Sequence, residues 1–193
     1  MKIGVLAIQG DFAEHVTMLK SLGVEAVEVR LPAQLDGLDG LILPGGESTT
    51  IGKLCVDFKL LEPLQEFGRK HAIWGTCAGA ILLSKDARRD QPLLGLMDIT
   101  VERNAFGRQV DSFEADLDIE PLKKATGSEA PYHAVFIRAP IIASVYGRAR
   151  VLSVLPDGRI VAARQGKLLA TSFHPELTQD TRFHAFFLSL AKP

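Results

Sequence analysis

The chain has 193 residues, of which 47% are hydrophobic and 23% are charged, and its formal net charge is -1. This size and composition fit one domain over residues 1–193 that buries its own core without disulfide or metal support. Two cysteines exclude a disulfide framework, no apolar run reaches the roughly 20 residues of a membrane helix, and no block of like charges favours nucleic acid or an anionic membrane as partner.

The first half alternates between strand-like and helix-like segments. Residues 3–8 are typical of a buried strand rather than of a signal peptide, so we expect the protein in the cytoplasm. In chain order the pattern predicts a strand at 3–8, a helix at 12–22 ending at Gly23, strands at 25–30 and 41–43, a helix from Ser48 or Thr49 to about Phe67, a strand at 71–74 and a helix at 80–83. This alternation indicates a parallel sheet.

The second half has shorter apolar strands separated by turns. Residues 94–119 and 134–170 follow this pattern, which is typical of antiparallel hairpins, and we expect loops at residues 84–91 and 121–131. A last helix is expected at residues 180–190. The sequence thus predicts an α/β fold, a three-layer sandwich with a mainly parallel central sheet flanked by helices, plus antiparallel strands in the second half.

Cys77 lies between the strand at 71–74 and the helix at 80–83, within Gly75-Thr76-Cys77-Ala78-Gly79. A side chain on such a turn stands at the carboxyl end of a strand and near the positive end of a helix, which favours a reactive thiolate. Taken alone, a cysteine is more often a small buried hydrophobe, and Cys55, inside a predicted helix, fits that interpretation. The two flanking glycines favour a nucleophile at position 77, because they permit a sharp turn and close helix packing.

A base and a carboxylate occur together in Ser172-Phe173-His174-Pro175-Glu176. Pro175 favours an extended backbone, and in an extended segment His174 and Glu176 point to the same side, so the carboxylate can orient the imidazole. These residues supply the other two parts of a Cys-His-acid triad. The alternative is that Glu176 only caps the last helix.

The segment Gly45-Gly46-Glu47-Ser48-Thr49 has two interpretations. It is either a strand-to-helix turn or a source of backbone N–H groups for an oxyanion. It lacks the Gly-Lys-Ser/Thr ending of a phosphate-binding loop. The five histidines show no zinc-binding spacing, so we expect no metal.

Two arginines, Arg103 and Arg138, lie among apolar or small residues. A guanidinium group in such surroundings often meets a carboxylate. That carboxylate belongs either to the protein or to an amino-acid substrate, and the spacing leaves both open.

Taken together, these motifs resemble the family of glutaminase subunits of pyridoxal phosphate synthase, within the triad-type class I glutamine amidotransferases. The resemblance spans the chain in six segments: residues 7–10, 43–49, 75–79, 103–109, 136–140 and 172–177. The segments at 75–79 and 172–177 are shared by all triad-type members. Pro-Gly-Gly-Glu-Ser-Thr, Arg-Asn-Ala-Phe-Gly-Arg and Phe-Ile-Arg-Ala-Pro are more specific.

The resemblance implies that the protein hydrolyses L-glutamine to glutamate and ammonia. Cys77 would be the nucleophile, His174 the general acid and base, and Glu176 the residue that orients His174. Gly46 and Ala78 would supply the oxyanion hole. Glutamine would be held by residues 46–48 (Gly46, Glu47 and Ser48), Arg103, Ile137 and Arg138.

The resemblance also implies a partner. Ammonia would pass to the synthase subunit of pyridoxal 5'-phosphate synthase in a large hetero-oligomer, Gln9 would face that subunit, and docking would complete the oxyanion hole. The chain itself would need no cofactor. Asp11 stands where the family more often has a small residue, and we expect it beside the interface but outside the chemistry.

Three alternatives remain open from the sequence. The chain could serve a different amidotransferase pathway, it could be another cysteine hydrolase or redox protein on a similar sheet, or it could be a noncatalytic subunit that binds a partner. Loss of glutamate release on Cys77→Ala would support the glutaminase, whereas partner binding without a thioester captured by a glutamine-analogue electrophile would identify the noncatalytic subunit.

Overall fold

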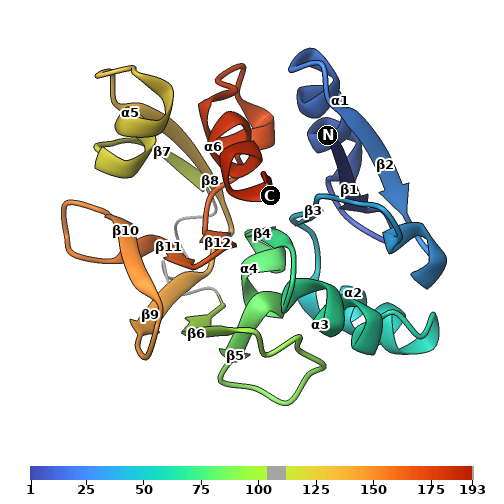
Figure 1. Ribbon diagram of the computed structural model, residues 1–193. Coiled ribbons are helices and arrows are strands. Elements are labelled where there is room, and N and C mark those ends of the chain that lie inside the picture. Colours follow the sequence, from blue (N-terminus) through green and yellow to red (C-terminus); the bar gives the residue numbers. More distant parts are fainter. Residues whose placement is uncertain (104–111, 193) are drawn as a thin grey trace.

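The computed structural model describes residues 1–103 and 112–192, so residues 104–109 of the Arg103 motif lie outside the described part (Figure 1). The elements in chain order are β1 (Lys2–Leu6), α1 (Phe12–Ser21), β2 (Glu25–Val29), η1 (Pro32–Leu35), β3 (Gly40–Leu43), α2 (Ser48–Asp57), α3 (Leu61–Gly68), β4 (Ala72–Thr76), α4 (Ala78–Leu83), β5 (Ser84–Asp86), β6 (Met97–Glu102), β7 (Ser112–Leu117), α5 (Glu120–Thr126), β8 (Tyr132–Ile137), β9 (Ile141–Val145), β10 (Arg150–Val154), β11 (Ile160–Gln165), β12 (Leu168–Thr171), η2 (Pro175–Leu177) and α6 (Arg182–Ala191).

One mixed sheet organises the described residues. Its ten strands follow the order β2-β1-β3-β4-β12-β11-β9-β6-β5, with β10 paired to β11. Strands β2, β1, β3, β4 and β12 are parallel, and the pairings from β12 through β11 and β9 to β6 are antiparallel. Strands β7 and β8 form a separate antiparallel pair. The predicted α/β fold, parallel at the centre and antiparallel in the second half, is confirmed.

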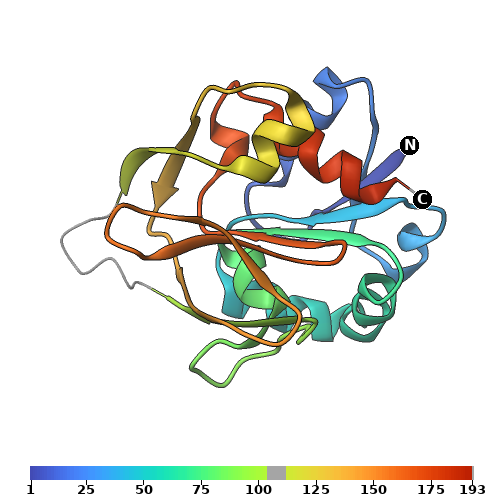
Figure 2. The same ribbon diagram turned by 60° about the vertical axis from the view of Figure 1, so that its left-hand side comes forward.

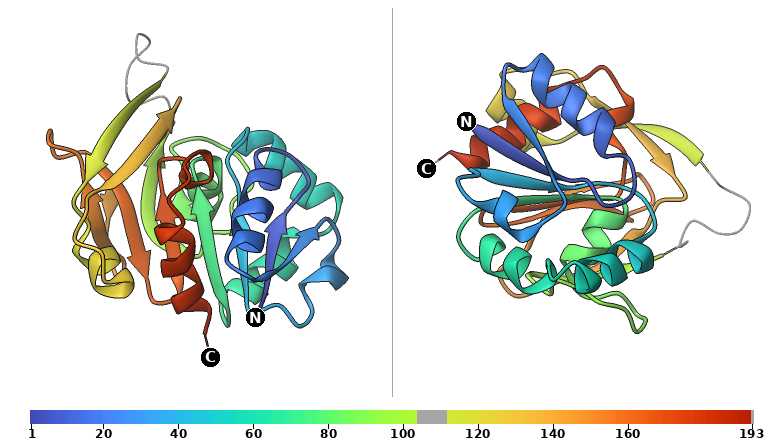
Figure 3. Two further views of the ribbon diagram at one scale, coloured as in Figure 1. Left: turned by 90° about the horizontal axis from the view of Figure 1, so that it is seen from above. Right: turned by 90° about the vertical axis from the view of Figure 1, so that its right-hand side faces the viewer.

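Helices cover both faces of the sheet (Figure 3). Successive side chains of a strand point to opposite faces, so Leu41 and Leu43 of β3 join the core beneath α2, α3 and α4, and Ile42 joins the core beneath α1 and α6. Trp74 of β4 lies in the second core. Helix α5 packs against α6, next to the β7–β8 pair (Figure 2). Each helix in the described residues is too short or too polar to traverse a lipid bilayer.

The parallel strands place the candidate site. Because β1, β3, β4 and β12 run in one direction, their carboxyl ends meet at one edge of the sheet, where α/β proteins usually bind ligands. Gln9 follows β1, Gly46 follows β3, Cys77 follows β4 and His174 follows β12. Four segments that are distant in sequence therefore converge.

The single helix expected from Ser48 or Thr49 to about Phe67 is wrong in two respects. It is broken into α2 and α3 at residues 58–60, where Lys59 adopts a positive φ of 57°. Its cap is Glu47, whose side chain accepts hydrogen bonds from the N–H groups of Thr49 and Thr50. Pro63 was the missed signal, because proline is tolerated only in the first turn of a helix.

Both expected loops contain regular structure. Residues 84–91 begin with the short strand β5, and residues 121–131 overlap α5. Three residues are too few to show a periodicity, and Pro121 suggests a loop although it is equally suited to a helix start. Gly127, with φ of 70°, ends α5 in the left-handed conformation.

Candidate active site

Cys77 occupies a strained turn between β4 and α4. Its φ of 48° and ψ of -106° lie outside the regions that L-residues normally adopt. The flanking glycines make the turn possible: a Cβ on Gly79 would lie 2.0 Å from the carbonyl oxygen of Leu43, and one on Gly75 would lie 2.4 Å from Gly79 backbone. The packing therefore requires glycine on both sides of the cysteine.

His174 and Glu176 follow β12. The prediction of an extended segment is wrong, because Pro175–Leu177 form the 3-10 helix η2. The two side chains nevertheless lie next to each other, as expected. Nδ1 of His174 lies 2.7 Å from Oε1 of Glu176, and the His174 N–H donates to the carbonyl of Val135 at 2.8 Å. Glu176 is buried behind the imidazole, 5% exposed.

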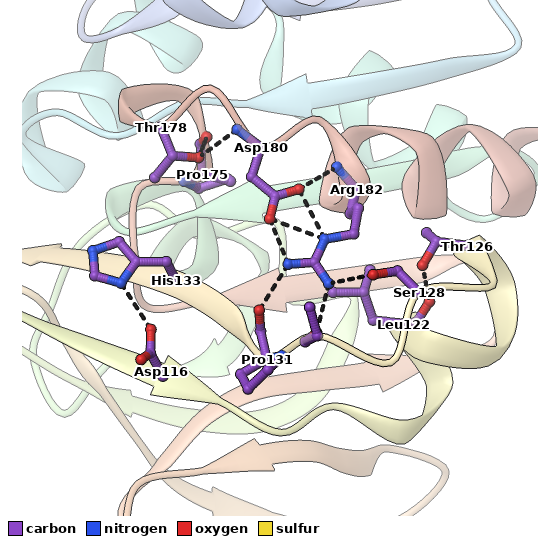
Figure 4. Close-up of polar contacts among 11 residues, drawn as sticks. Asp116, Leu122, Thr126, Ser128, Pro131, His133, Pro175, Thr178, Asp180 and Arg182 are labelled. Carbon is purple, nitrogen blue, oxygen red and sulfur yellow. Dashed lines mark hydrogen bonds and ion pairs between the residues drawn. The ribbon is translucent and has the colours of Figure 1, made fainter.

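The turn that carries Glu176 is tied to the neighbouring elements (Figure 4). The hydroxyl of Thr178 donates to the Pro175 carbonyl at 3.1 Å and accepts from the Asp180 N–H at 3.2 Å. Arg182 pairs with Asp180 at 2.6 Å and donates to the carbonyl of Pro131 at 2.8 Å. These contacts fix η2 against the start of α6 and the segment that enters β8.

The three residues of the predicted triad interact electrostatically. Burial alone would lower the pKa of His174, but hydrogen bonds to Cys77 and Glu176 outweigh it and raise that pKa to about 10. Burial raises the pKa of Glu176, and the hydrogen bond from His174 opposes this effect. A protonated His174 between the cysteine sulfur and the carboxylate is therefore the favoured state.

A pocket of about 420 Å³ opens at this edge of the sheet. Its lining includes every predicted site residue except Glu176: Gln9, Gly46, Glu47, Ser48, Cys77, Ala78, Arg103, Ile137, Arg138 and His174. Asp11, Ile81, Pro140 and Leu177 also line it. Pro140 and Leu177 end two of the motif segments, whereas Ile81 lies outside all six. The folded chain thus brings described residues from all six segments to one site, Arg103 being the one from the segment at 103–109.

Gln9 and Gly46 meet in the wall of the pocket. Oε1 of Gln9 accepts a hydrogen bond from the Glu47 N–H at 2.9 Å. Gly46 has φ of 147°, and a Cβ there would lie 2.6 Å from the same Gln9 oxygen, so only glycine fits. The loop after β1 and the loop after β3 are therefore in direct contact.

Arg103 is held by the protein's own groups at the pocket rim. Its Nη1 lies 2.8 Å from Oε1 of Glu47 and 3.1 Å from Oγ1 of Thr49. Burial tends to raise the pKa of Glu47, but hydrogen bonds from Thr50 and Thr49 and the charge of Arg103 lower it to about 2. Arg103 thus meets a carboxylate of the protein, that of Glu47, and both residues line the cavity.

Asp11 lies beside the histidine. Its carboxylate is 3.7 Å from Nδ1 of His174 and lines the pocket, closer to the candidate triad than the sequence suggested. Asp11, His174 and Glu176 each bring a potential metal-ligand atom within 4.8 Å of the others. An ion there would have to displace the bond between His174 and Glu176, because Nδ1 of His174 is already engaged by it.

The fold and this arrangement of cysteine, histidine and carboxylate define a triad-type glutamine amidotransferase. The model of the SNO glutamine amidotransferase family matches residues 5–192, and this protein belongs to that family. It is 61% identical to pyridoxal 5'-phosphate synthase subunit PdxT of Herpetosiphon aurantiacus, over 98% of this chain and 100% of that one. It is 56% identical to PdxT of Moorella thermoacetica, over 98% and 99%.

Solved structures agree with the fold. One described as a glutamine amidotransferase superposes with a TM-score of 0.90 at 51% identity, over 98% of both chains. PurLQS of Thermotoga maritima gives a TM-score of 0.74 at 18% identity, over 99% of this chain and 98% of that one. At this identity the similarity supports the fold only. The expected resemblance to class I glutamine amidotransferases is confirmed.

Proposed function

We propose that this protein hydrolyses L-glutamine to L-glutamate and ammonia through a thioester on Cys77, and delivers the ammonia to the synthase subunit of pyridoxal 5'-phosphate synthase. The observation that carries the proposal is the assembly of Cys77 and His174 at one pocket, with the buried Glu176 2.7 Å from His174. The pathway is supported by identities of 61% and 56% to proteins named as subunits of that synthase.

The first half-reaction uses all three residues. The Cys77 sulfur attacks the side-chain amide carbon of glutamine, and the carbonyl oxygen becomes an oxyanion bound by the backbone N–H groups of Gly46 and Ala78. His174 gives its proton to the amide nitrogen, the C–N bond breaks, and ammonia leaves a glutamyl thioester. Loss of one oxyanion donor costs about 3 to 4 kcal/mol in such sites.

Water completes the cycle. His174, now neutral, takes a proton from water as the oxygen attacks the thioester carbon, and the C–S bond breaks to release glutamate and the Cys77 thiolate. Glu176 holds the imidazole in one tautomer throughout. No cofactor or metal takes part in these steps.

The remaining pocket residues suit an amino-acid substrate. The guanidinium of Arg103 matches the α-carboxylate of glutamine, and Glu47, ionised at neutral pH because its pKa is about 2, matches the α-ammonium group. Gly46, Ser48, Ile137 and Arg138 complete the proposed binding site.

The synthase partner docks, in this proposal, on the face that carries Gln9, within a large hetero-oligomer in the cytoplasm. Because Gln9 Oε1 bonds the Glu47 N–H at 2.9 Å, a partner that moves Gln9 also moves the residue next to Gly46. Docking can thereby complete the oxyanion hole. Residues 1–193 act as one glutamine amidotransferase domain.

The test is glutamate release from glutamine by the purified chain, with and without its synthase partner. The proposal predicts release that rises on addition of the synthase and is abolished in Cys77→Ala. Release that survives Cys77→Ala would disprove the nucleophile. Synthase binding without any glutamine hydrolysis would instead identify a noncatalytic subunit.

A further inference from the structure

Two histidines outside the proposed triad lie in the core between α1 and α6. His15 and His184 are fully buried, each 0% exposed, and both rings pack edge-on against Trp74. Polar rings are rarely buried among aromatic side chains without hydrogen-bonding partners, because the loss of water is costly. Their partners connect them to the active site.

The second oxygen of the triad carboxylate faces His15. Oε1 of Glu176 bonds His174, whereas Oε2 is buried and has no well-aligned hydrogen bond among the described residues. Nε2 of His15 lies 3.3 Å from this Oε2 and 3.2 Å from the hydroxyl oxygen of Thr76. A small rotation of the His15 ring would direct an N–H to the carboxylate.

The hydrogen bonds determine which nitrogen of His15 carries the proton. Nδ1 of His15 lies 3.0 Å from Nε2 of His184, and Nδ1 of His184 has no partner among the described residues. If His184 donates a hydrogen bond from Nε2, its unpartnered Nδ1 carries no proton and is only an acceptor. Nδ1 of His15 then accepts that hydrogen bond, so His15 carries its own proton on Nε2, toward Glu176. The opposite choice leaves a buried N–H without an acceptor and sets two lone pairs against each other at Glu176.

We propose that His15 is a positioning residue for the glutaminase reaction: its Nε2–H, fixed in that tautomer by His184, holds the Glu176 carboxylate aimed at His174. This inference rests on the proposed function. Burial lowers the pKa of both histidines, so each is neutral at physiological pH and can act as a donor without adding charge. The chain of contacts runs from α6 through α1 to the triad.

Two substitutions of His15 by an amide residue distinguish the role of its Nε2 from that of its Nδ1. The amide nitrogen of glutamine can occupy the place of the histidine Nε2, and that of asparagine the place of Nδ1. In the complex with the synthase, we expect His15→Asn to lower kcat about 10-fold or more with little change in KM. His15→Gln should retain kcat within about 3-fold of the wild type.

A pH profile distinguishes positioning from a general loss of stability. The titratable groups around Glu176 are His174 on its own segment, Asp11 just before α1, His15 on α1 and Tyr132 on β8. Without the donor from His15, Glu176 should protonate more readily, so the acidic limb of kcat/KM moves to higher pH in His15→Asn. Val16→Ala, a buried neighbour on the same helix, is the control: it should lower the Tm and leave the limb in place.

Nitrogen-15 NMR of histidine-labelled protein tests the tautomer independently of activity. The proposal predicts a protonated Nε2 and an unprotonated Nδ1 on His15. Protonation on Nδ1, equal kcat for His15→Asn and wild type, or a loss in His15→Gln as large as that in His15→Asn would each overturn it. Absence of glutamine hydrolysis by the wild-type complex would overturn the proposed function instead.

Discussion

His174 and Glu176 are joined by a 2.7 Å contact between Nδ1 and Oε1, inside a turn rather than along a strand. The carboxylate is buried while the imidazole reaches the pocket, so the pair presents only Nε2 of His174 to a substrate. Because Glu176 accepts a hydrogen bond from the Nδ1–H of His174, Nε2 of His174 is available for proton transfer with Cys77.

Replacement of the buried carboxylate should stop this proton transfer. Glu176→Gln retains the shape, but an amide can donate to Nδ1 and select the wrong tautomer, so we expect kcat to fall by a factor on the order of 10³ to 10⁴ with little change in KM. Steady-state glutamate release in the presence of the synthase measures it. Glu62→Gln, exposed on α3, is the matched control. Activity near that of the control would exclude Glu176 from the triad.

Arg103 should affect binding more than chemistry. Arg103→Lys loses the planar fork that matches a carboxylate and weakens the 2.8 Å contact with Glu47, so we expect KM for glutamine to rise about 10-fold at nearly constant kcat. Arg88→Lys, in an exposed ion pair with Glu102 at 3.4 Å, should change neither constant. A lower kcat at unchanged KM would contradict the assignment.

The strained backbone at Cys77 predicts an unusual order of stabilities. Cys77→Gly and Cys77→Ala both remove the sulfur and differ by one Cβ, which at φ of 48° and ψ of -106° is strained. We expect Cys77→Gly to be more stable than Cys77→Ala by about 1 kcal/mol, because relief of strain exceeds the entropy cost of glycine. Urea unfolding compares the two. If the alanine variant is the more stable one, the turn is not strained in solution.

The buried histidines predict acid sensitivity. Burial lowers the pKa of His184 from 6.5 to about 4, so the unfolded chain binds a proton there as pH falls below 6.5 and the native chain does not until about 4. The free energy of unfolding should therefore fall by about 1.5 kcal/mol from this one group between about pH 6.5 and about pH 5.

His184→Phe removes that contribution, whereas the contribution of His15, which has the same sign, remains. His174 does not interfere, because its pKa is raised to about 10 and its effect on stability lies above pH 6.5. Urea unfolding across the interval should show a shallower pH dependence in the variant. An unchanged slope would mean that His184 is protonated in the native state.

The sequence predicted the sheet well because strong local signals mark it. Continuous apolar runs at residues 3–8 and 41–43 and the glycines around Cys77 locate strands β1 and β3 and the turn after β4. The break at Lys59 was not predicted, because no glycine marks its positive φ and the signal given by Pro63 was missed.

The pocket could be predicted only in part. Motif residues such as Gly46 and Arg103 are recognisable by type and spacing, and parallel strands bring their segments to one edge. Asp11 and His15 carry no motif, and their proximity to His174 and Glu176 arises from the docking of α1 on the sheet. Such contacts between distant segments depend on tertiary packing.

The central claim is that the sulfur of Cys77 is the nucleophile and forms the thioester bond to the glutamyl group. The most direct measurement is peptide mapping by mass spectrometry after the synthase complex is treated with a glutamine-analogue electrophile. Cys55 is an internal control, because burial raises its pKa to about 12. The account predicts one adduct, on Cys77, that excess glutamine suppresses and that His174→Ala slows; an unmodified Cys77, or modification that glutamine does not prevent, would contradict it.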